Sequence, residues 1–170
     1  MTVTLPSALA ERAIVSVGGY IVAKNNIILS TYGLGTCVGV VIFDKINSIG
    51  GMLHLMLPDS KLSPEKAEKR PAMFADTGFK QLMQTFWEYG GMTQNANVLI
   101  AGGASILNNS EGFNIGQRNS VAVKQQMNHY KLVARVEETG GFDNRTLHLN
   151  IGTGEVDIKT SSGKKTISLK

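Results

Sequence analysis

Two consecutive apolar runs constrain the fold of this chain most strongly. Residues 37–43 (CVGVVIF) and 49–57 (IGGMLHLML) are apolar on both faces, and the polar turn 44–47 (DKIN) separates them. Strands with apolar side chains on both faces are buried inside layered structures. We therefore predict a buried β-hairpin within a layered domain.

This hairpin would bring a thiol and an imidazole close together. Cys37 is the only cysteine of the 170 residues, and His54 lies in the second run. A two-residue turn would put Cys37 opposite His54, and a four-residue turn at 45–48 would put it opposite Met56, one step from His54 on the same face. An odd-numbered turn, or a bulge at Gly50-Gly51, would separate the two side chains. With an even-numbered turn, His54 is a candidate base for a nucleophilic thiolate.

Cys37 and His54 also fit a purely structural interpretation. A free cysteine packs as a small hydrophobic residue, and a single histidine on an apolar strand is often a satisfied core residue. However, Cys37 follows a loop that contains Gly33 and Gly35. Backbone N–H groups freed by these glycines could stabilise a thiolate or a developing oxyanion. The position therefore favours catalysis.

A catalytic base usually needs a third group that fixes its orientation. Thr31 and Ser30 are the nearest polar residues in the loop segment, and they could equally close a turn. If Cys37 is catalytic, its pKa should lie below the ~8.5 of free cysteine, and alkylation should be fast at neutral pH. A buried structural thiol should react slowly until the chain unfolds.

Strands and helices both follow from the remaining pattern, in a single domain. Residues 1–13 are expected to form an N-terminal arm with a helical turn around 8–12, and residues 161–170 a solvated C-terminal tail, so that the domain spans 14–160. Within it, residues 59–70 are expected as a loop or a short helix, and residues 108–116 as a loop. The expected strands are 14–23, 26–30, 37–43, 49–57, 98–101, 132–137, 145–151 and 155–159, and the expected helices are 71–89 and 117–130.

Composition argues against several classes of function. The formal net charge is only +4, and the basic residues are scattered except over 159–170, so no nucleic-acid surface is predicted. No secretory leader and no apolar run of roughly 20 residues is present, which predicts a cytoplasmic protein without membrane insertion. His129 and His148 share no ligand spacing with His54, and residues 102–104 (GGA) match no phosphate-binding loop. We expect neither a metal nor an organic cofactor.

A set of short motifs lies along the chain at 35–38 (GTCV), 50–54 (GGMLH), 57–58 (LP), 101–104 (AGGA), 115–119 (IGQRN), 139–141 (TGG) and 153–156 (TGEV). This ordered set resembles the CheD family of chemoreceptor glutamine deamidases. The motifs lie in the family's order and cover roughly residues 14–160. Two positions depart from the pattern: Phe74 stands where a tyrosine is expected, and Gln117 where an acidic residue is frequent.

The resemblance implies an α+β fold in which two packed β-sheets are flanked by helices, similar to the catalytic domain of cytotoxic necrotising factor. It implies hydrolytic deamidation of selected glutamines to glutamates on the cytoplasmic helices of chemotaxis receptors, which tunes adaptation. Cys37 would be the nucleophile, His54 the base and Thr31 the orienting group. Gly35, Thr36 and Ser30 would line the oxyanion and substrate site.

The resemblance also implies a second partner, a CheC-type CheY-phosphate phosphatase that competes with receptor. This leaves an alternative function open, in which the chain is a non-catalytic binding module that regulates the phosphatase. A further alternative is another amidase, or a receptor methylesterase that uses the same thiol. Retention of Cys37, His54 and Thr31 favours the deamidase.

Overall fold

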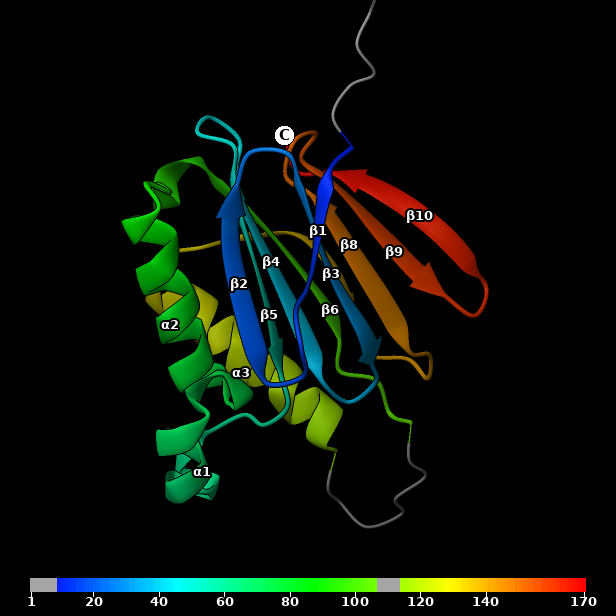
Figure 1. Cartoon of the computed structure of the whole chain (residues 1–170). Helices are drawn as coiled ribbons and strands as arrows, with labels where there is room; N and C mark the ends of the chain where they lie inside the picture. Colours follow the sequence, from blue (N-terminus) through cyan, green and yellow to red (C-terminus); the bar gives the residue numbers. More distant parts are fainter. Residues whose placement is uncertain (1–8, 107–113) are drawn as a thin grey trace, which may run out of the picture.

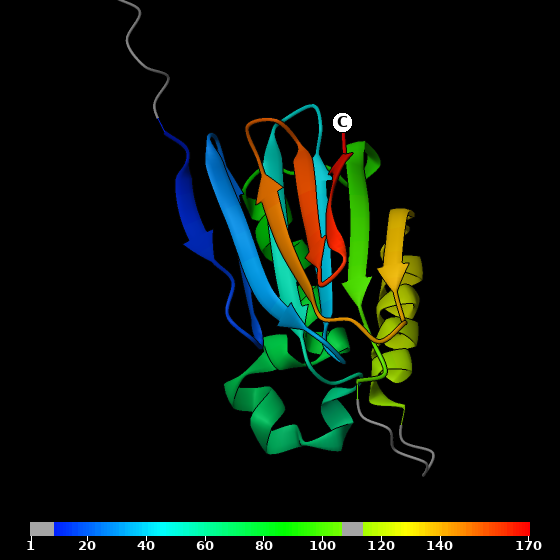
Figure 2. The same ribbon diagram turned by 90° about the vertical axis from the view of Figure 1, so that its right-hand side faces the viewer.

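The computed structural model of the chain describes residues 9–106 and 114–170. Within these residues, ten strands form two five-stranded sheets that pack face to face, and the helices lie against the outer face of only one sheet (Figures 1 and 2). The predicted fold class, two packed β-sheets with flanking helices, is confirmed. None of the helices in the described part of the chain is long and apolar enough to span a membrane.

Both sheets are mixed. All neighbouring strands run antiparallel except β1–β3 and β6–β7, which are parallel. In spatial order, sheet A contains β1 (Glu11–Ile14), β3 (Ile27–Leu34), β8 (Arg145–Asn150), β9 (Glu155–Thr160) and β10 (Gly163–Ser168). Sheet B contains β2 (Gly19–Lys24), β5 (Ile49–Leu55), β4 (Val38–Asp44), β6 (Ala96–Gly102) and β7 (Ala134–Thr139).

Two main apolar cores hold these layers together. One lies between sheets A and B, and the other lies between sheet B and helices α2 and α3. Helix α2 packs on the second core through one apolar face, since its side chains at 79, 82, 83 and 86 are all buried. The helices are α1 (Pro64–Lys69), α2 (Ala75–Glu88) and α3 (Ile115–His129), with short 3₁₀ turns at Ser60–Leu62, Pro71–Met73 and Thr93–Asn95.

The predicted hairpin is the pair β4–β5, and every residue of both strands is buried. Asp44 pairs with Ile49, so the turn contains the four residues 45–48. The buried Asp44 carboxylate closes this turn by accepting hydrogen bonds from the backbone N–H groups of Ile46 and Asn47, both at 2.9 Å. Because a turn fixes the register of a hairpin, this local contact decides which residues face each other along both strands.

Both end segments contribute strands to sheet A, which therefore extends beyond the expected boundaries 14–160. The helical turn expected around 8–12 is wrong for Glu11 and Arg12, because they belong to β1 and pair with β3; residue 8 lies outside the described residues. Residues 163–168, expected in a solvated tail, form the edge strand β10. Of the loop expected at 108–116, residues 108–113 lie outside the described part, and α3 already begins at 115.

Candidate active site

The turn at 45–48 brings Cys37 and His54 to the same side of sheet B. His54 pairs with Gly39, and extending the register by one residue beyond Val38 places Cys37 opposite Met56. Cys37 packs against the core between the sheets, and His54 contacts sheet A. Of the two even-numbered turns predicted, the four-residue turn is therefore correct, and the two side chains are diagonal neighbours.

Thr31 determines which nitrogen of His54 carries the proton. The Thr31 hydroxyl lies 2.8 Å from the carbonyl oxygen of Val15 and 2.8 Å from His54 Nδ1. A carbonyl can only accept, so the single hydroxyl proton is donated to Val15. Thr31 must then accept from His54, which places the ring proton on Nδ1 and leaves Nε2 of the neutral ring with a free lone pair.

The free nitrogen is held in an environment that keeps the ring neutral. His54 is fully buried, and no described group makes a hydrogen bond to its Nε2. Burial lowers the pKa of His54 from 6.5 to about 4, because a charged imidazolium is poorly solvated there. The buried acceptor is therefore costly for the folded chain and available to a proton from a nearby group.

The loop before Cys37 offers two free backbone donors. Among the described residues, the N–H groups of Thr36 and Cys37 make no backbone hydrogen bond, and the Cys37 N–H lies close enough to its own sulfur to favour the thiolate. Gly35 is closely packed, since a Cβ atom there would lie 2.4 Å from the Ile106 side chain. Unpaired N–H groups beside a nucleophile are the donors of which oxyanion holes are made.

The end of β6 holds this loop in place. The N–H groups of Gly103 and Ala104 donate to the carbonyls of Cys37 and Gly35, both at 2.8 Å. Gly102 has a φ of 110°, and a Cβ atom at this position would lie 2.2 Å from the Cys37 carbonyl oxygen. Only glycine allows this approach. Residues 102–104, which match no nucleotide-binding loop, therefore position the thiol.

Asn119 on α3 ties the two halves of the site together. Its Nδ2 group donates to the carbonyl oxygens of Thr36 at 3.0 Å and Met56 at 2.9 Å. These carbonyls lie on the loop before Cys37 and just after β5. No role was predicted for Asn119 from the sequence. Asn119 nevertheless lies on the same buried face of α3 as the apolar Val123, and a polar residue on such a face was a usable signal.

Ser30 is not brought to this site. Successive side chains of a strand point to opposite faces, so Thr31 faces sheet B and Ser30 faces away from it. The Ser30 hydroxyl instead lies 2.7 Å from Nδ1 of His148 on β8. The structure thus brings Cys37, His54 and Thr31 into one place, with Gly35 and Thr36 on the adjoining loop.

The predicted charge state of the thiol is wrong. Burial raises the pKa of Cys37, and its own backbone N–H only partly offsets this effect. The packing of Cys37 against the core between the sheets is not visible in the sequence. His54 does not offset this burial, because its ring is neutral and its Nε2 makes no hydrogen bond to the sulfur.

We expect iodoacetamide to alkylate Cys37 of the folded chain more slowly at pH 7 than it alkylates a free cysteine. The rate should keep rising above pH 9, since the pKa of the thiol is raised. Intact-mass time courses over a pH series measure this rate, with the urea-unfolded chain as the reference. A rate that levels off below pH 8 would contradict the assigned direction of the shift.

The free energy of unfolding should fall by about 2 kcal/mol between pH 7 and pH 5 through His54 alone. The pKa of His54 is about 4 in the folded chain and ordinarily 6.5, so below pH 6.5 the unfolded chain binds a proton that the folded chain does not. The stabilisation is therefore present above pH 6.5 and lost as the pH falls towards 4. Urea titrations at both pH values measure it, and His54→Gln should show a correspondingly smaller fall.

Comparisons with known proteins identify the family of this chain. The family model described as "CheD chemotactic sensory transduction" matches residues 56–160, which is more than half of the chain. A protein of Syntrophus aciditrophicus named "Probable chemoreceptor glutamine deamidase CheD 1" is 42% identical over 151 residues, covering 88% of this chain and 94% of the relative. The chain belongs to the CheD family.

Other CheD relatives match over a similar length. The "Chemoreceptor glutamine deamidase CheD" of Thermotoga maritima is 35% identical over 159 residues, or 94% of this chain and 98% of the relative. A "Probable chemoreceptor glutamine deamidase CheD" of Desulforamulus reducens is 40% identical over 149 residues, or 86% and 89%. The CheD family model begins at residue 56 and therefore includes neither Cys37 nor His54. These two positions are compared only with the sequences of individual relatives.

Proposed function

We propose that this chain hydrolyses the side-chain amide of selected glutamines on chemoreceptors, giving glutamate and ammonia. One observation carries the mechanism: Nε2 of the buried His54 is unprotonated and has no partner among the described residues, on a side chain that is a diagonal neighbour of Cys37 on the same face of sheet B. The names of the CheD relatives supply the substrate class.

In the first half of the reaction, Cys37 forms a thioester with the glutamine side chain. His54 Nε2 takes the thiol proton while the sulfur attacks the amide carbon. The C–N bond then breaks, and the imidazolium returns the proton to the leaving nitrogen as ammonia departs. In the second half, Nε2 takes a proton from water as the water oxygen attacks the thioester, and the proton returns to the sulfur as glutamate is released.

The neutral resting state of the pair is compatible with this sequence. Burial disfavours both an isolated thiolate and an isolated imidazolium, as the shifts of both pKa values indicate. A thiolate and an imidazolium formed together stabilise each other, so proton transfer is favoured once the substrate is bound and water is excluded. Thr31 supports this step by holding Nδ1 as the donor, which leaves Nε2 as the nitrogen that accepts the proton.

The N–H groups of Thr36 and Cys37 are proposed to bind the oxyanion of each tetrahedral intermediate. Neither makes a backbone hydrogen bond among the described residues, and residues 103–104 and Asn119 hold their loop from two sides. Donors fixed before the reaction need no reorganisation when negative charge develops on the substrate oxygen. Ser30 has no part in this proposal, because it faces away from the site.

We further propose that the substrate glutamines lie on receptor helices and that a CheC-type phosphatase competes for the same surface. The second partner rests on the family resemblance alone. A binding module without catalysis would not require an unpartnered imidazole nitrogen at a buried position, which favours the enzyme over the module.

Peptide mass spectrometry of a purified receptor cytoplasmic fragment tests the function. After incubation with the chain, specific glutamine peptides should gain about 1 Da, because hydrolysis replaces NH₂ with OH. Loss of a methylene mass from methylated peptides would instead identify a methylesterase. A fragment that binds the chain but remains unmodified would contradict the deamidase and support the binding module.

A further inference from the structure

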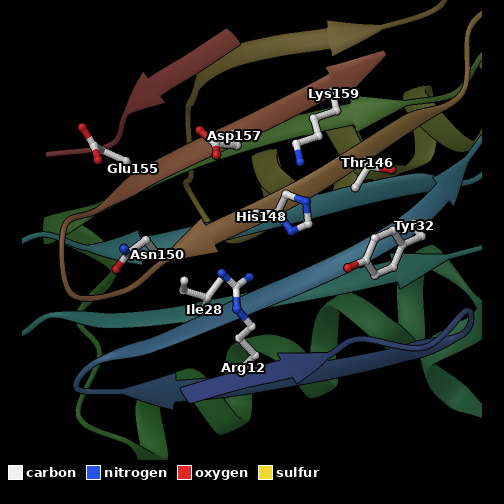
Figure 3. A pocket seen from close by; sticks show the side chains of 9 residues that line it. All are labelled: Arg12, Ile28, Tyr32, Thr146, His148, Asn150, Glu155, Asp157 and Lys159. Atoms are coloured by element: carbon white, nitrogen blue, oxygen red, sulfur yellow. The ribbon is translucent and has the colours of Figure 1, made fainter. Parts of the chain in front are cut away.

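The outer face of sheet A contains a polar concavity that the proposed reaction does not use. No described helix covers this face (Figures 1 and 2), and the concavity of about 510 Å³ spans β1, β3, β8 and β9 (Figure 3). It lies on the opposite side of β3 from Thr31, and therefore on the opposite side of sheet A from Cys37 and His54.

Two cationic side chains converge on the middle of the concavity. Arg12 on β1 and Lys159 on β9 point towards His148 from opposite sides (Figure 3). Neither side chain forms a hydrogen bond or an ion pair with a residue in the described part of the chain. Cations that are drawn together without a counter-charge leave an attractive position for an anion.

The nearby carboxylates do not neutralise this pair of cations. Asp157 is already engaged, since it accepts from the Thr166 hydroxyl at 2.5 Å and from the Lys164 amino group at 3.3 Å. Glu155 lies at the end of the concavity away from Lys159 (Figure 3). The positive charge of Arg12 and Lys159 is therefore not balanced where the two side chains meet.

The charges around His148 are mostly positive, and they add to burial in lowering its pKa. Its pKa is lowered by burial first, then by Lys159, and also by Arg12 and Lys164, with Asp157 alone acting in the opposite direction. The surrounding charges named here come from β1, which lies beyond β3 on one side of β8, and from β9 and β10 on the other side. Their sum opposes a further positive charge and would be offset by a bound anion.

Neutral donors complete the lining. The Ser30 hydroxyl contacts His148 Nδ1 at 2.7 Å, and the Tyr32 ring packs edge-on against the imidazole with 5.7 Å between ring centroids. These contacts orient the imidazole. The hydroxyls of Tyr32 and Thr146 lie at the same end of the concavity as Lys159 (Figure 3).

We propose that this concavity binds a soluble small molecule that carries a phosphate monoester, with the phosphate between Arg12 and Lys159. Donors that approach from opposite sides suit a tetrahedral oxyanion better than a planar carboxylate, which pairs best with a single guanidinium fork. The volume of about 510 Å³ exceeds that of a phosphate group and leaves room for an attached organic group against Ile28 and the Tyr32 ring. This site is separate from deamidation and does not depend on it.

Titrations of the 170-residue chain with inorganic phosphate and glycerol 3-phosphate test the proposal. Histidine and tyrosine NMR signals should shift saturably at His148 and Tyr32, and calorimetry should give the same dissociation constant. Arg12→Gln and Lys159→Gln should each weaken binding about tenfold or more. The matched charge control is Lys66→Gln on α1, which lies on the helix-covered side and should leave the affinity unchanged. Deamidation by Arg12→Gln should equal that of the original chain.

Binding should also strengthen as the pH falls, because the anion favours protonated His148. Sulfate, which remains a dianion throughout, is the probe for this dependence. The proposal is overturned if neither phosphate probe binds saturably, or if Lys66→Gln weakens binding as much as Lys159→Gln. It is also overturned if vesicles containing phosphatidic acid bind the chain while both soluble phosphates do not.

Discussion

Replacing Cys37 with alanine should reduce receptor deamidation by about 10³-fold or more, because no other described group near the site can form the thioester. The Cys37→Ser variant should be almost as inactive, since a hydroxyl without a strong base is a far weaker nucleophile. The measurement is ammonia release together with the mass of the receptor peptides. Cys37 lies on a loop and is partly exposed, so both variants should fold.

Unchanged thermal unfolding temperatures would establish that Cys37→Ala and Cys37→Ser are folded. A folded Cys37→Ala chain that retained more than a tenth of the original rate would exclude the thiol as the nucleophile. In that case the unpartnered Nε2 of His54 would have no thiol proton to accept during catalysis.

Replacing His54 with glutamine should reduce deamidation by about 10²- to 10⁴-fold, the usual contribution of a general base. The matched control is His129→Gln at the exposed end of α3, which should leave the rate unchanged. The rate should be measured from pH 6 to pH 10. If Nε2 accepts the thiol proton, activity of the variant should recover partly at high pH, where hydroxide removes that proton without help.

Thr31 is a positioning residue in this account, and its removal should have a smaller effect. Thr31→Val should reduce the rate by about 10- to 100-fold, because the ring loses the contact that holds its proton on Nδ1. Thr85→Val is the matched control, since the Thr85 hydroxyl makes a hydrogen bond of 3.0 Å with the Tyr20 hydroxyl on the helix side of sheet B. Equal effects of the two variants would indicate a structural role for Thr31 only.

The sequence predicted the part of this site that depends on local pairing. Two apolar runs and one polar turn define the β4–β5 hairpin, and the alternation of a strand then determines that Cys37 and His54 share a face. The remaining choice between a two-residue and a four-residue turn depended on the Asp44 carboxylate. The Asp44 carboxylate accepts from the N–H groups of residues 46 and 47, which are close in sequence. The sequence nevertheless does not indicate whether these hydrogen bonds form a two-residue or a four-residue turn.

Features that depend on contacts between distant segments could not be predicted. The orientation of Ser30 required knowledge of which face of β3 meets sheet B, and the link from Asn119 to the Cys37 loop spans 83 positions of sequence. The prediction of a lowered pKa for the Cys37 thiol was wrong for the same reason, since Cys37 is buried by packing between the sheets.

The two strands at the ends of the chain were missed for a different reason. The strand β10 contains Lys164 and Lys165, is exposed at most positions, and therefore lacks the alternation of a half-buried strand. The strand β1 has only four residues, which is too few to show a period. Edge strands that are short or charged are usual, because such edges resist pairing with other chains.

The most direct test of the central claim is to trap the covalent intermediate on Cys37. The original chain is mixed with a receptor fragment, quenched in acid at a series of short times and analysed by intact-mass spectrometry, followed by peptide mapping. We predict an adduct whose mass is that of the chain plus the fragment less one ammonia, attached at Cys37 and absent from Cys37→Ala. Deamidated fragment without any adduct at Cys37, in every variant and at every quench time, would contradict the thioester mechanism.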